Sequence, residues 1–378
     1  MTDTFIAPAG LKGVVVADTR IGDVRGDEGR FHYRGLDAIA LAESAAFEDV
    51  WHLVLCGSLP DPVASAAFRA RVGAARAAVP ADVLDLVVRT ARDAAAAGHA
   101  DPLEVLRVGL SRLAIGETPL LDASEDERLD RALTLAAHVP TLLAAASRAG
   151  RGLEPIAPDP AADHVADYLR MTTGAASAAD ARALASYLIA TVDHGSNAST
   201  FAARVVASTG AGVASCVLAA IGAFLGPLHG GAPSRALAAI LEIEPGRERD
   251  WVRERIARGE RIMGFGHAVY RTRDPRSEML RRIVARIDDP LVPRAIALER
   301  AIEAALAAEK PGRDLHANVE YYAGVLMRLI GLDPAMFTAT FAVARVVGWS
   351  AHVLEQAAAG KIIRPATRYV GPEPATPR

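Results

Sequence analysis

Residues Gly264–Arg276, which read GFGHAVYRTRDPR, carry the most specific chemical pattern in the chain. His267 follows two glycines, and three arginines come after it, the last of them Arg276. Glycine lets the backbone approach a ligand closely, and arginine binds carboxylates and phosphates through its planar guanidinium. Asp274 and Pro275 restrict the chain just before Arg276, which favours a fixed guanidinium over a solvated basic loop. The stretch therefore predicts a site for an anionic ligand.

Two other histidines also lie beside glycines or helix boundaries. His194 lies in DHGSNASTF and His229 in GPLHGGA. Any one of the three, taken alone, is explained by a core or loop histidine bonded to a backbone carbonyl. A neutral histidine at such a position can also donate a hydrogen bond to a developing oxyanion. A metal-dependent hydrolase that uses all three as ligands is an alternative, but neither HExxH nor a comparable ligand spacing occurs.

Charged side chains in apolar surroundings complete the candidate set. Glu320, in ANVEYYAG, has apolar and aromatic neighbours that would raise its pKa and suit a base acting on a C–H bond; a surface carboxylate at a helix end is the alternative. Arg345 in FAVAR and Arg364 in IIRPATRYVGP need an anionic partner or ligand. His352 and Glu355 could form half of a metal site, but we interpret them as ordinary helix packing and pairing.

Composition narrows the class of protein. The 378 residues are 51% hydrophobic and 23% charged, which indicates a globular protein with a sizeable core and two or three domains, or a large one with an appendage. The net charge of −3 argues against nucleic-acid and anionic-membrane partners. Neither a dinucleotide motif nor a P-loop occurs. The two cysteines lie far apart and the N-terminus shows no signal peptide, so we expect a cytoplasmic protein.

Elements rich in Ala, Leu and Arg predict a mainly α protein. Short strands are expected at 14–16, within 17–29 and at 30–33. The segment 205–228 is expected to be one buried apolar helix rather than a membrane span, because it is rich in small residues. Capping residues and glycine stops predict further helices at 102–116, 177–192, 247–258 and 293–310.

The chain resembles citrate synthases over nearly its whole length. The stretches that carry the resemblance follow in family order: GLKGVVVADTRIGDV, DHGSNASTFAARVVAST, GPLHGGA, GFGHAVYRTRDPR and FAVARVVGWSAHVLEQ with IIRPATRYVGP. The resemblance implies a mainly α citrate synthase fold, with a large helical domain from residues 1–230 and 332–378. An inserted smaller domain, 231–331, would close over the substrates. It also implies a homodimer with shared active sites, acetyl-CoA and oxaloacetate as substrates, and no metal or cofactor.

The resemblance also assigns roles to residues. His229 would polarise the thioester carbonyl of acetyl-CoA, Glu320 would take a proton from its methyl group, and His267 would bond the ketone of oxaloacetate and protonate the new alkoxide. The residues implied to bind oxaloacetate are His194, Asn197, Arg276, Arg345 and, donated by the second subunit, Arg364. Those implied to bind CoA are Arg271, Met263, Gly264, Phe265, Gly266 and Asn318.

One position departs from the family pattern. The usual base is an aspartate in a PNVDFYSG-like stretch, whereas ANVEYYAG carries Glu320. Glutamate is one methylene longer, and a misplacement of about 1 Å can cost about a hundredfold in rate. We favour an active enzyme. A 2-methylcitrate synthase using propionyl-CoA and a non-catalytic protein that binds CoA or a dicarboxylate remain alternatives.

Overall fold

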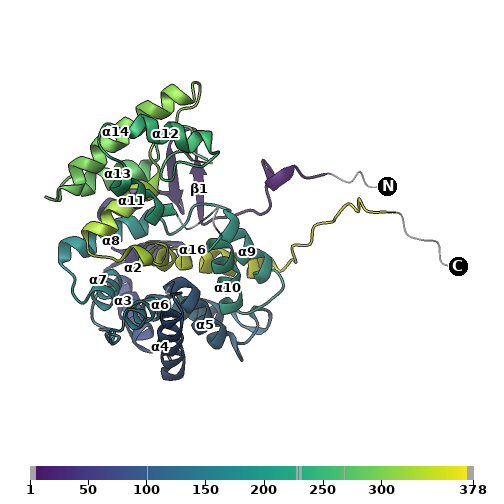
Figure 1. Ribbon diagram of the computed structural model, residues 1–378. Coiled ribbons are helices and arrows are strands. Elements are labelled where there is room, and N and C mark those ends of the chain that lie inside the picture. Colours follow the sequence, from purple (N-terminus) through teal and green to yellow (C-terminus); the bar gives the residue numbers. More distant parts are fainter. Residues whose placement is uncertain (1–5, 100, 227–228, 230–231, 268, 373–378) are drawn as a thin grey trace.

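The computed structural model describes residues 6–99, 101–226, 229, 232–267 and 269–372. The mainly α class is confirmed, because helices make up most of the described chain and the strands form a single small sheet (Figure 1). The helices are α1 Ala38–Ser44, α2 Phe47–Cys56, α3 Pro62–Ala77, α4 Ala81–Ala96, α5 Pro102–Ala114, α6 Glu125–Gly150, α7 His164–Thr173, α8 Ala178–Ile189, α9 Ala198–Ala207, α10 Val213–Phe224, α11 Ala232–Glu242, α12 Glu248–Ala257, α13 Pro275–Val284, α14 Leu291–Glu309, α15 Val319–Leu329 and α16 Phe337–Ala359. Short 3₁₀ turns occur at Ala9–Leu11, Leu120–Asp122 and Pro334–Met336.

The predicted helix starts are confirmed to within two residues, and their caps explain why. The Asp101 side chain accepts a hydrogen bond from the Leu103 N–H, with Pro102 in the first helical position of α5. The Ser177 hydroxyl accepts one from the Asp180 N–H at the start of α8. Each cap satisfies a backbone donor that the helix itself leaves unpaired.

Helix α16 runs through the middle of the molecule (Figure 1). It packs against α6, α9, α10 and α2. Its Trp349 is fully buried. The segment Pro334–Ala359 is long and apolar enough to cross a membrane, but 89% of its most apolar window is buried within the protein, as expected of a core helix.

The single helix expected over 205–228 is wrong. The described part of this segment contains the end of α9 and all of α10, separated by 208–212, while Pro227 and Leu228 lie outside the described residues. Gly210 adopts a left-handed φ of 81°, which ends α9, and Gly212 is the N-cap of α10. A glycine-rich break of this kind lets two apolar helices fold back against each other, and α9 and α10 are in close contact.

The N-terminal strands are confirmed only in part. Strands β1 Gly22–Arg25, β2 Arg30–Tyr33 and β3 Leu36–Asp37 form one antiparallel sheet in that order. The expected strand at 14–16 is wrong. Val15 is 84% exposed, and within the described ranges no strand pairs with this segment, so its β-branched side chains have neither a partner nor a core to cover.

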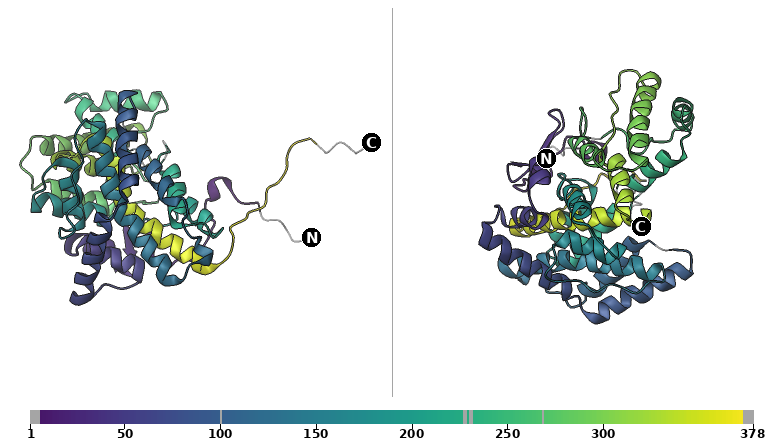
Figure 2. Two further views of the ribbon diagram at one scale, coloured as in Figure 1. Left: turned by 90° about the horizontal axis from the view of Figure 1, so that it is seen from below. Right: turned by 90° about the vertical axis from the view of Figure 1, so that its left-hand side faces the viewer.

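Two groups of helices are separated in space. Figures 1 and 2 show α11 to α14 lying away from α3 to α6, with α16 between them. Helices α11 and α13 both pack on α15, and α12 packs on α14. The predicted boundary at 230/231 falls on residues that are not described, so the division into domains stays a prediction. After α16, residues 360–372 extend away from the helices (Figure 2).

Candidate active site

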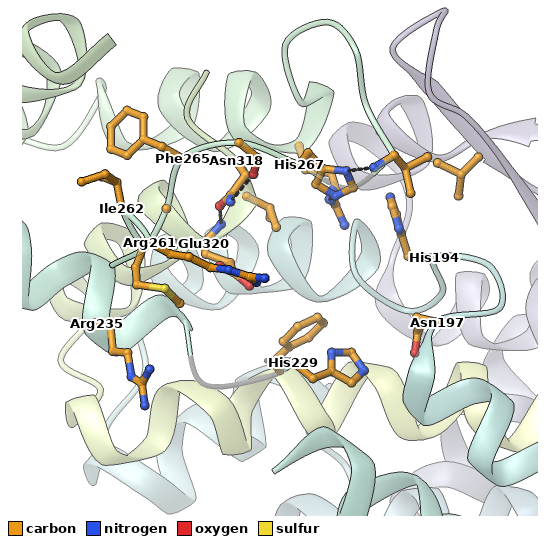
Figure 3. A pocket seen from close by; sticks show the side chains of 18 of the residues that line it. His194, Asn197, His229, Arg235, Arg261, Ile262, Phe265, His267, Asn318 and Glu320 are labelled. Carbon is orange, nitrogen blue, oxygen red and sulfur yellow. Dashed lines mark hydrogen bonds between the residues drawn. The ribbon is translucent and has the colours of Figure 1, made fainter. Parts of the chain in front are cut away.

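A cleft of about 1290 Å³ brings together residues from distant parts of the chain (Figure 3). Its walls come from the segment after α8, the loop before α13, the start of α15 and the middle of α16. The predicted site residues that line it are His194, Asn197, His229, Met263, Gly264, Phe265, Gly266, His267, Arg276, Asn318, Glu320 and Arg345. Most of the predicted site is therefore assembled in one place.

The loop 264–266 forms one wall, and glycine is required in it. Gly264 and Gly266 have φ values of 83° and 80°, in the left-handed region that favours glycine. Asn318 fixes this loop to α15, because its Nδ2 donates to the Gly266 carbonyl at 2.9 Å while its Oδ1 accepts from the Glu320 N–H at 3.0 Å. The Asn318 N–H also donates to the Gly264 carbonyl at 2.8 Å. One side chain thus couples the loop to the residue predicted as the base.

The proton of His267 can be placed from its contacts. Its Nδ1 accepts hydrogen bonds from the N–H groups of Val269 and Tyr270, at 2.9 and 3.0 Å, so a neutral ring carries its proton on Nε2. Burial, together with the charge of Arg276, lowers the pKa of His267 to about 4, so the ring is neutral at pH 7. Nη2 of Arg276 lies within hydrogen-bonding distance of Nε2, at 3.1 Å, so both ring nitrogens face donors although a neutral ring has only one acceptor nitrogen. With Nδ1 as that acceptor, Nε2–H and Nη2 are two donors side by side, and an oxygen atom placed between them would accept from both.

Arg276 is held as the sequence predicts. Its Nε and Nη2 donate to the two oxygens of Asp274 at 2.9 and 2.8 Å, and both side chains are at most 3% exposed. The same carboxylate accepts from the Arg276 and Val319 N–H groups, each at 3.0 Å. Burial raises the pKa of Asp274, but Arg276 outweighs this and holds it below its usual value. Asp274 thus fixes the guanidinium and joins α13 to α15.

His194 lies beside His267, with ring centroids 5.4 Å apart. Burial, with the charge of Arg276, lowers the pKa of His194 well below its usual value, so this ring is also neutral. Its Nε2 lies 3.1 Å from the hydroxyl of Tyr270, a buried residue of the loop that carries His267. This contact joins the α8–α9 segment to that loop.

His229 is contacted from α9. Asn197 is the N-cap of α9, where its side chain accepts from the Thr200 N–H. The Ser199 hydroxyl lies 2.9 Å from Nε2 of His229 and accepts from the indole N–H of Trp349 at 3.1 Å. Burial lowers the pKa of His229 to about 4. All three cleft histidines can therefore serve as neutral hydrogen-bond donors.

Glu320 lies in the first turn of α15 and faces the cleft (Figure 3). Burial raises its pKa to about 7, partly offset by Arg276. Among the described residues, no hydrogen-bond donor contacts its carboxylate oxygens. The nearby Asn318 accepts a hydrogen bond only from the backbone N–H of Glu320. A desolvated carboxylate without partners is a stronger base than one in water, and it can accept a proton near neutral pH.

Arg345 is 2% exposed and lies on the inner face of α16. Its Nε donates to the Thr191 carbonyl at 2.9 Å, and its guanidinium lies 4.6 Å from the centroid of the Phe341 ring. Burial lowers the pKa of Arg345 to about 10, so it is charged at pH 7. The cleft therefore contains two buried arginines, Arg276 and Arg345, as a dicarboxylate would require.

Two predicted site residues lie outside this cleft. Arg271 and Arg364 are exposed and do not line it. Their assignments, to CoA and to the second subunit's site, stay predictions.

Three further residues at the site have contacts that the sequence did not predict. Tyr270 lies within the motif GFGHAVYRTRDPR, and Ser199 lies within DHGSNASTF, so the motifs did mark their positions. Asp274 was predicted to restrict the chain, but not to bind both Arg276 and the start of α15.

Metal ligation was considered for the three histidines. Across 6–99, 101–226, 229, 232–267 and 269–372, no three His, Cys, Asp or Glu side chains are grouped as metal ligands. His352 and Glu355 instead both contact Arg204, as the packing and pairing interpretation predicts.

Comparison with known proteins identifies this arrangement. A family model described as "Citrate synthase, C-terminal domain" matches residues 10–366. The chain belongs to the citrate synthase family. It is 36% identical to "Putative citrate synthase 2" of Mycobacterium tuberculosis, over 97% of this chain and 94% of that protein. It is also 36% identical to the 2-methylcitrate synthase of that organism, over 96% and 90%.

A solved citrate synthase shares the fold. The ternary complex of carboxymethyl coenzyme A and oxaloacetate with citrate synthase from Thermoplasma acidophilum superposes with a TM-score of 0.88 at 27% identity, covering 96% of each chain. The predicted citrate synthase fold is confirmed. The protein is thus an acyltransferase of the class that converts the acyl group into alkyl on transfer, and not the metal-dependent hydrolase considered above.

Proposed function

We propose that this protein condenses acetyl-CoA with oxaloacetate and water to give citrate and CoA. The observation that carries the proposal is the pair of converging donors on His267 and Arg276 in one cleft with Glu320, whose pKa is about 7. The two donors can bind the ketone oxygen of an electrophile, and the carboxylate can remove a proton from a carbon atom. A Claisen-type condensation needs both functions.

The reaction divides among three side chains. Glu320 removes a proton from the methyl group of the thioester, while His229 donates a hydrogen bond to the thioester oxygen as it gains charge. The resulting carbon nucleophile attacks the ketone carbon of oxaloacetate, and His267 donates its Nε2 proton to the ketone oxygen, which becomes a hydroxyl. Water then cleaves the C–S bond of the citryl thioester and releases CoA with a new carboxylate.

Substrate binding follows from the remaining residues. We assign the oxaloacetate carboxylates to His194, Arg276 and Arg345, with Asn197 beside them and Arg364 supplied by the second subunit of a homodimer. The extended segment 360–372, which leaves the body of the chain, supports this exchange (Figure 2). We assign CoA to the backbone of 263–267, with Asn318 and Arg271.

A second candidate function is 2-methylcitrate synthesis from propionyl-CoA. Its support is that relatives bearing both names are equally similar, at 36% identity. One methyl group is worth only about 1–3 kcal/mol in a pocket. We favour acetyl-CoA because Glu320 is one methylene longer than the family's usual aspartate, which leaves less room beside the reacting carbon.

Steady-state release of the CoA thiol, measured with oxaloacetate and either acetyl-CoA or propionyl-CoA, tests the proposal. The expected result is a higher kcat/KM for acetyl-CoA. A higher kcat/KM for propionyl-CoA would establish the second candidate instead. Binding of both substrates without thiol release would show a non-catalytic paralogue.

A further inference from the structure

A chain of buried polar groups lies behind Arg345, outside the cleft. Arg204, 3% exposed, donates from Nη1 to Oε2 of Glu355 at 2.8 Å and to Nδ1 of His352 at 2.7 Å. On its other side, Nε2 of His352 lies 3.0 Å from Oδ1 of Asp193. His352 is 1% exposed and Asp193 is 2% exposed. The chain therefore runs from Glu355 through Arg204 and His352 to Asp193, the residue just before His194.

The direction of the hydrogen bonds is fixed by arginine. A guanidinium only donates, so Nδ1 of His352 must accept from Arg204 and the ring proton is on Nε2. Nε2 then donates to Asp193, whose other oxygen accepts from the Gly195 N–H at 3.2 Å. Burial raises the pKa of Asp193, but its interactions with His352 and Arg345 outweigh this and hold it below its usual value. Asp193 is thus a charged carboxylate with a partner on each oxygen.

Close packing against α16 fixes the backbone at Asp193. At Gly348, helix α16 lies so near that an added Cβ would be 2.1 Å from the Val192 carbonyl oxygen and 3.5 Å from Cα of Asp193. At Gly22, an added Cβ would lie 3.1 Å from Oδ2 of Asp193. The backbone of Asp193 is therefore fixed, whereas the direction of its carboxylate depends on the contacts with His352 and with the Gly195 N–H.

The two buried arginines of the cleft are compensated differently. Arg276 binds Asp274 directly through Nε and Nη2. Among the described residues, no carboxylate lies within 4.0 Å of the Arg345 nitrogens; Asp193 acts on it from further away, opposing the lowering of its pKa by burial. The charge of Arg345 is thus balanced by Asp193 without a direct ion pair to its terminal nitrogens.

We propose that His352 is a positioning residue for oxaloacetate: supported by Arg204, it holds the Asp193 carboxylate away from Arg345, so that the terminal nitrogens of Arg345 stay free for a substrate carboxylate. Without the His352 donor, Asp193 would have a buried, unpartnered oxygen and a strong attraction to the nearest cation. A direct Asp193–Arg345 ion pair would then compete with the substrate. This inference rests on the proposed function, since it assigns Arg345 to oxaloacetate.

The test uses variants that differ in hydrogen bonding. His352→Gln keeps an acceptor for Arg204 and a donor for Asp193, whereas His352→Leu keeps neither. His352→Asn has the same groups but is too short to reach both partners, and it serves if the leucine variant does not fold. His164→Leu is the matched control, because His164 is also 1% exposed and its Nδ1 lies 3.3 Å from Arg76, whereas its ring packs on Phe47 and Trp51.

Oxaloacetate affinity is measured by calorimetry, together with the KM for each substrate, kcat, and the thermal unfolding midpoint. We expect His352→Leu and His352→Asn to raise the oxaloacetate Kd and KM about tenfold or more, with the KM for acetyl-CoA unchanged and kcat affected less. His352→Gln should remain within about threefold of wild type. His164→Leu should lower the unfolding midpoint without changing oxaloacetate affinity.

Equal oxaloacetate affinity in the wild-type, leucine and asparagine proteins would overturn the proposal. A loss in His352→Gln as large as in His352→Leu would also overturn it, because packing rather than hydrogen bonding would then explain the effect. If the folded wild-type protein itself does not bind oxaloacetate, the proposed function fails, and that result is distinct from a failure of the His352 role alone.

Discussion

Replacing Glu320 by glutamine separates the size of this side chain from its basicity. The amide has the same number of heavy atoms as the carboxylate but cannot accept the proton of the thioester methyl group. We expect Glu320→Gln to lower kcat at least about a hundredfold, the low end for a general base. Oxaloacetate affinity should change little, because the proposed carboxylate contacts are made by Arg276 and Arg345.

The raised pKa of Glu320 also predicts an effect on stability, with a definite sign. Its pKa is about 7 in the folded protein and 4.5 in its ordinary state. Between these values the folded protein holds a proton that the unfolded chain has released, so stability falls as the pH rises through this window. The difference corresponds to about 3 kcal/mol above pH 7, and contact with solvent in the cleft reduces this to about 2 kcal/mol.

Two assays follow. Denaturant unfolding should show Glu320→Gln more stable than wild type by about 2 kcal/mol at about pH 8.5 and nearly equal to it at about pH 4.5. The wild-type kcat/KM for thiol release should rise with pH through about 7, because the base must be ionised. Near-wild-type turnover of the glutamine variant, or a stability difference that does not depend on pH, would refute the reasoning.

The aspartate variant tests the geometry at the same position. If the backbone at the start of α15 suits the longer side chain, Glu320→Asp will fall short of the substrate and lower kcat. A higher kcat in Glu320→Asp would instead show that the longer side chain is a handicap.

Three further predictions concern the surroundings of the cleft. An added Cβ at Gly26 would lie 2.3 Å from the Val269 carbonyl oxygen, so Gly26→Ala should displace the loop of His267 and lower kcat/KM about tenfold or more. Gly150→Ala is the control: its added Cβ would have only a 3.8 Å contact, and kcat/KM should stay unchanged. Arg364→Ala and Glu320→Gln should each be nearly inactive as homodimers, and mixing them should restore part of the activity; a fully active monomer would contradict the shared site. Saturating oxaloacetate should make the small-angle scattering profile more compact, because a ligand held by both groups of helices favours the closed state, and identical profiles would contradict closure.

Local chemistry made the helices predictable, but not every boundary. The caps at Asp101 and Ser177 act within three residues of themselves, so sequence alone placed the starts of α5 and α8. In 205–228 both sides of the break are apolar, and hydrophobicity therefore does not reveal where α9 ends. Only the left-handed glycine at 210 marks it, and the same glycine inside an apolar stretch also suits close helix packing.

The candidate site was predictable where motifs concentrate it. The set around His267 and Arg276 lies within a single stretch, and the arginine's rigid partner Asp274 is two residues away. The contacts that support this set join residues that are remote in sequence. His352 and Asp193 are 159 positions apart, and His194 and Tyr270 are 76 apart. Their pairing depends on how α16 and the loop before α13 pack, which no local pattern contains.

The geometry of α16 sets how this region of the gene can change length. Phe341, Arg345, Trp349, His352 and Gln356 recur every three or four residues and all face inward. Because each residue turns an α-helix by about 100°, inserting or deleting one codon near Phe337 would rotate every later member of this row out of register at once. The exposed residues 365–372, beyond Arg364, have no such constraint. Length variation among natural or engineered homologues should therefore be tolerated after Arg364 and be almost absent within α16.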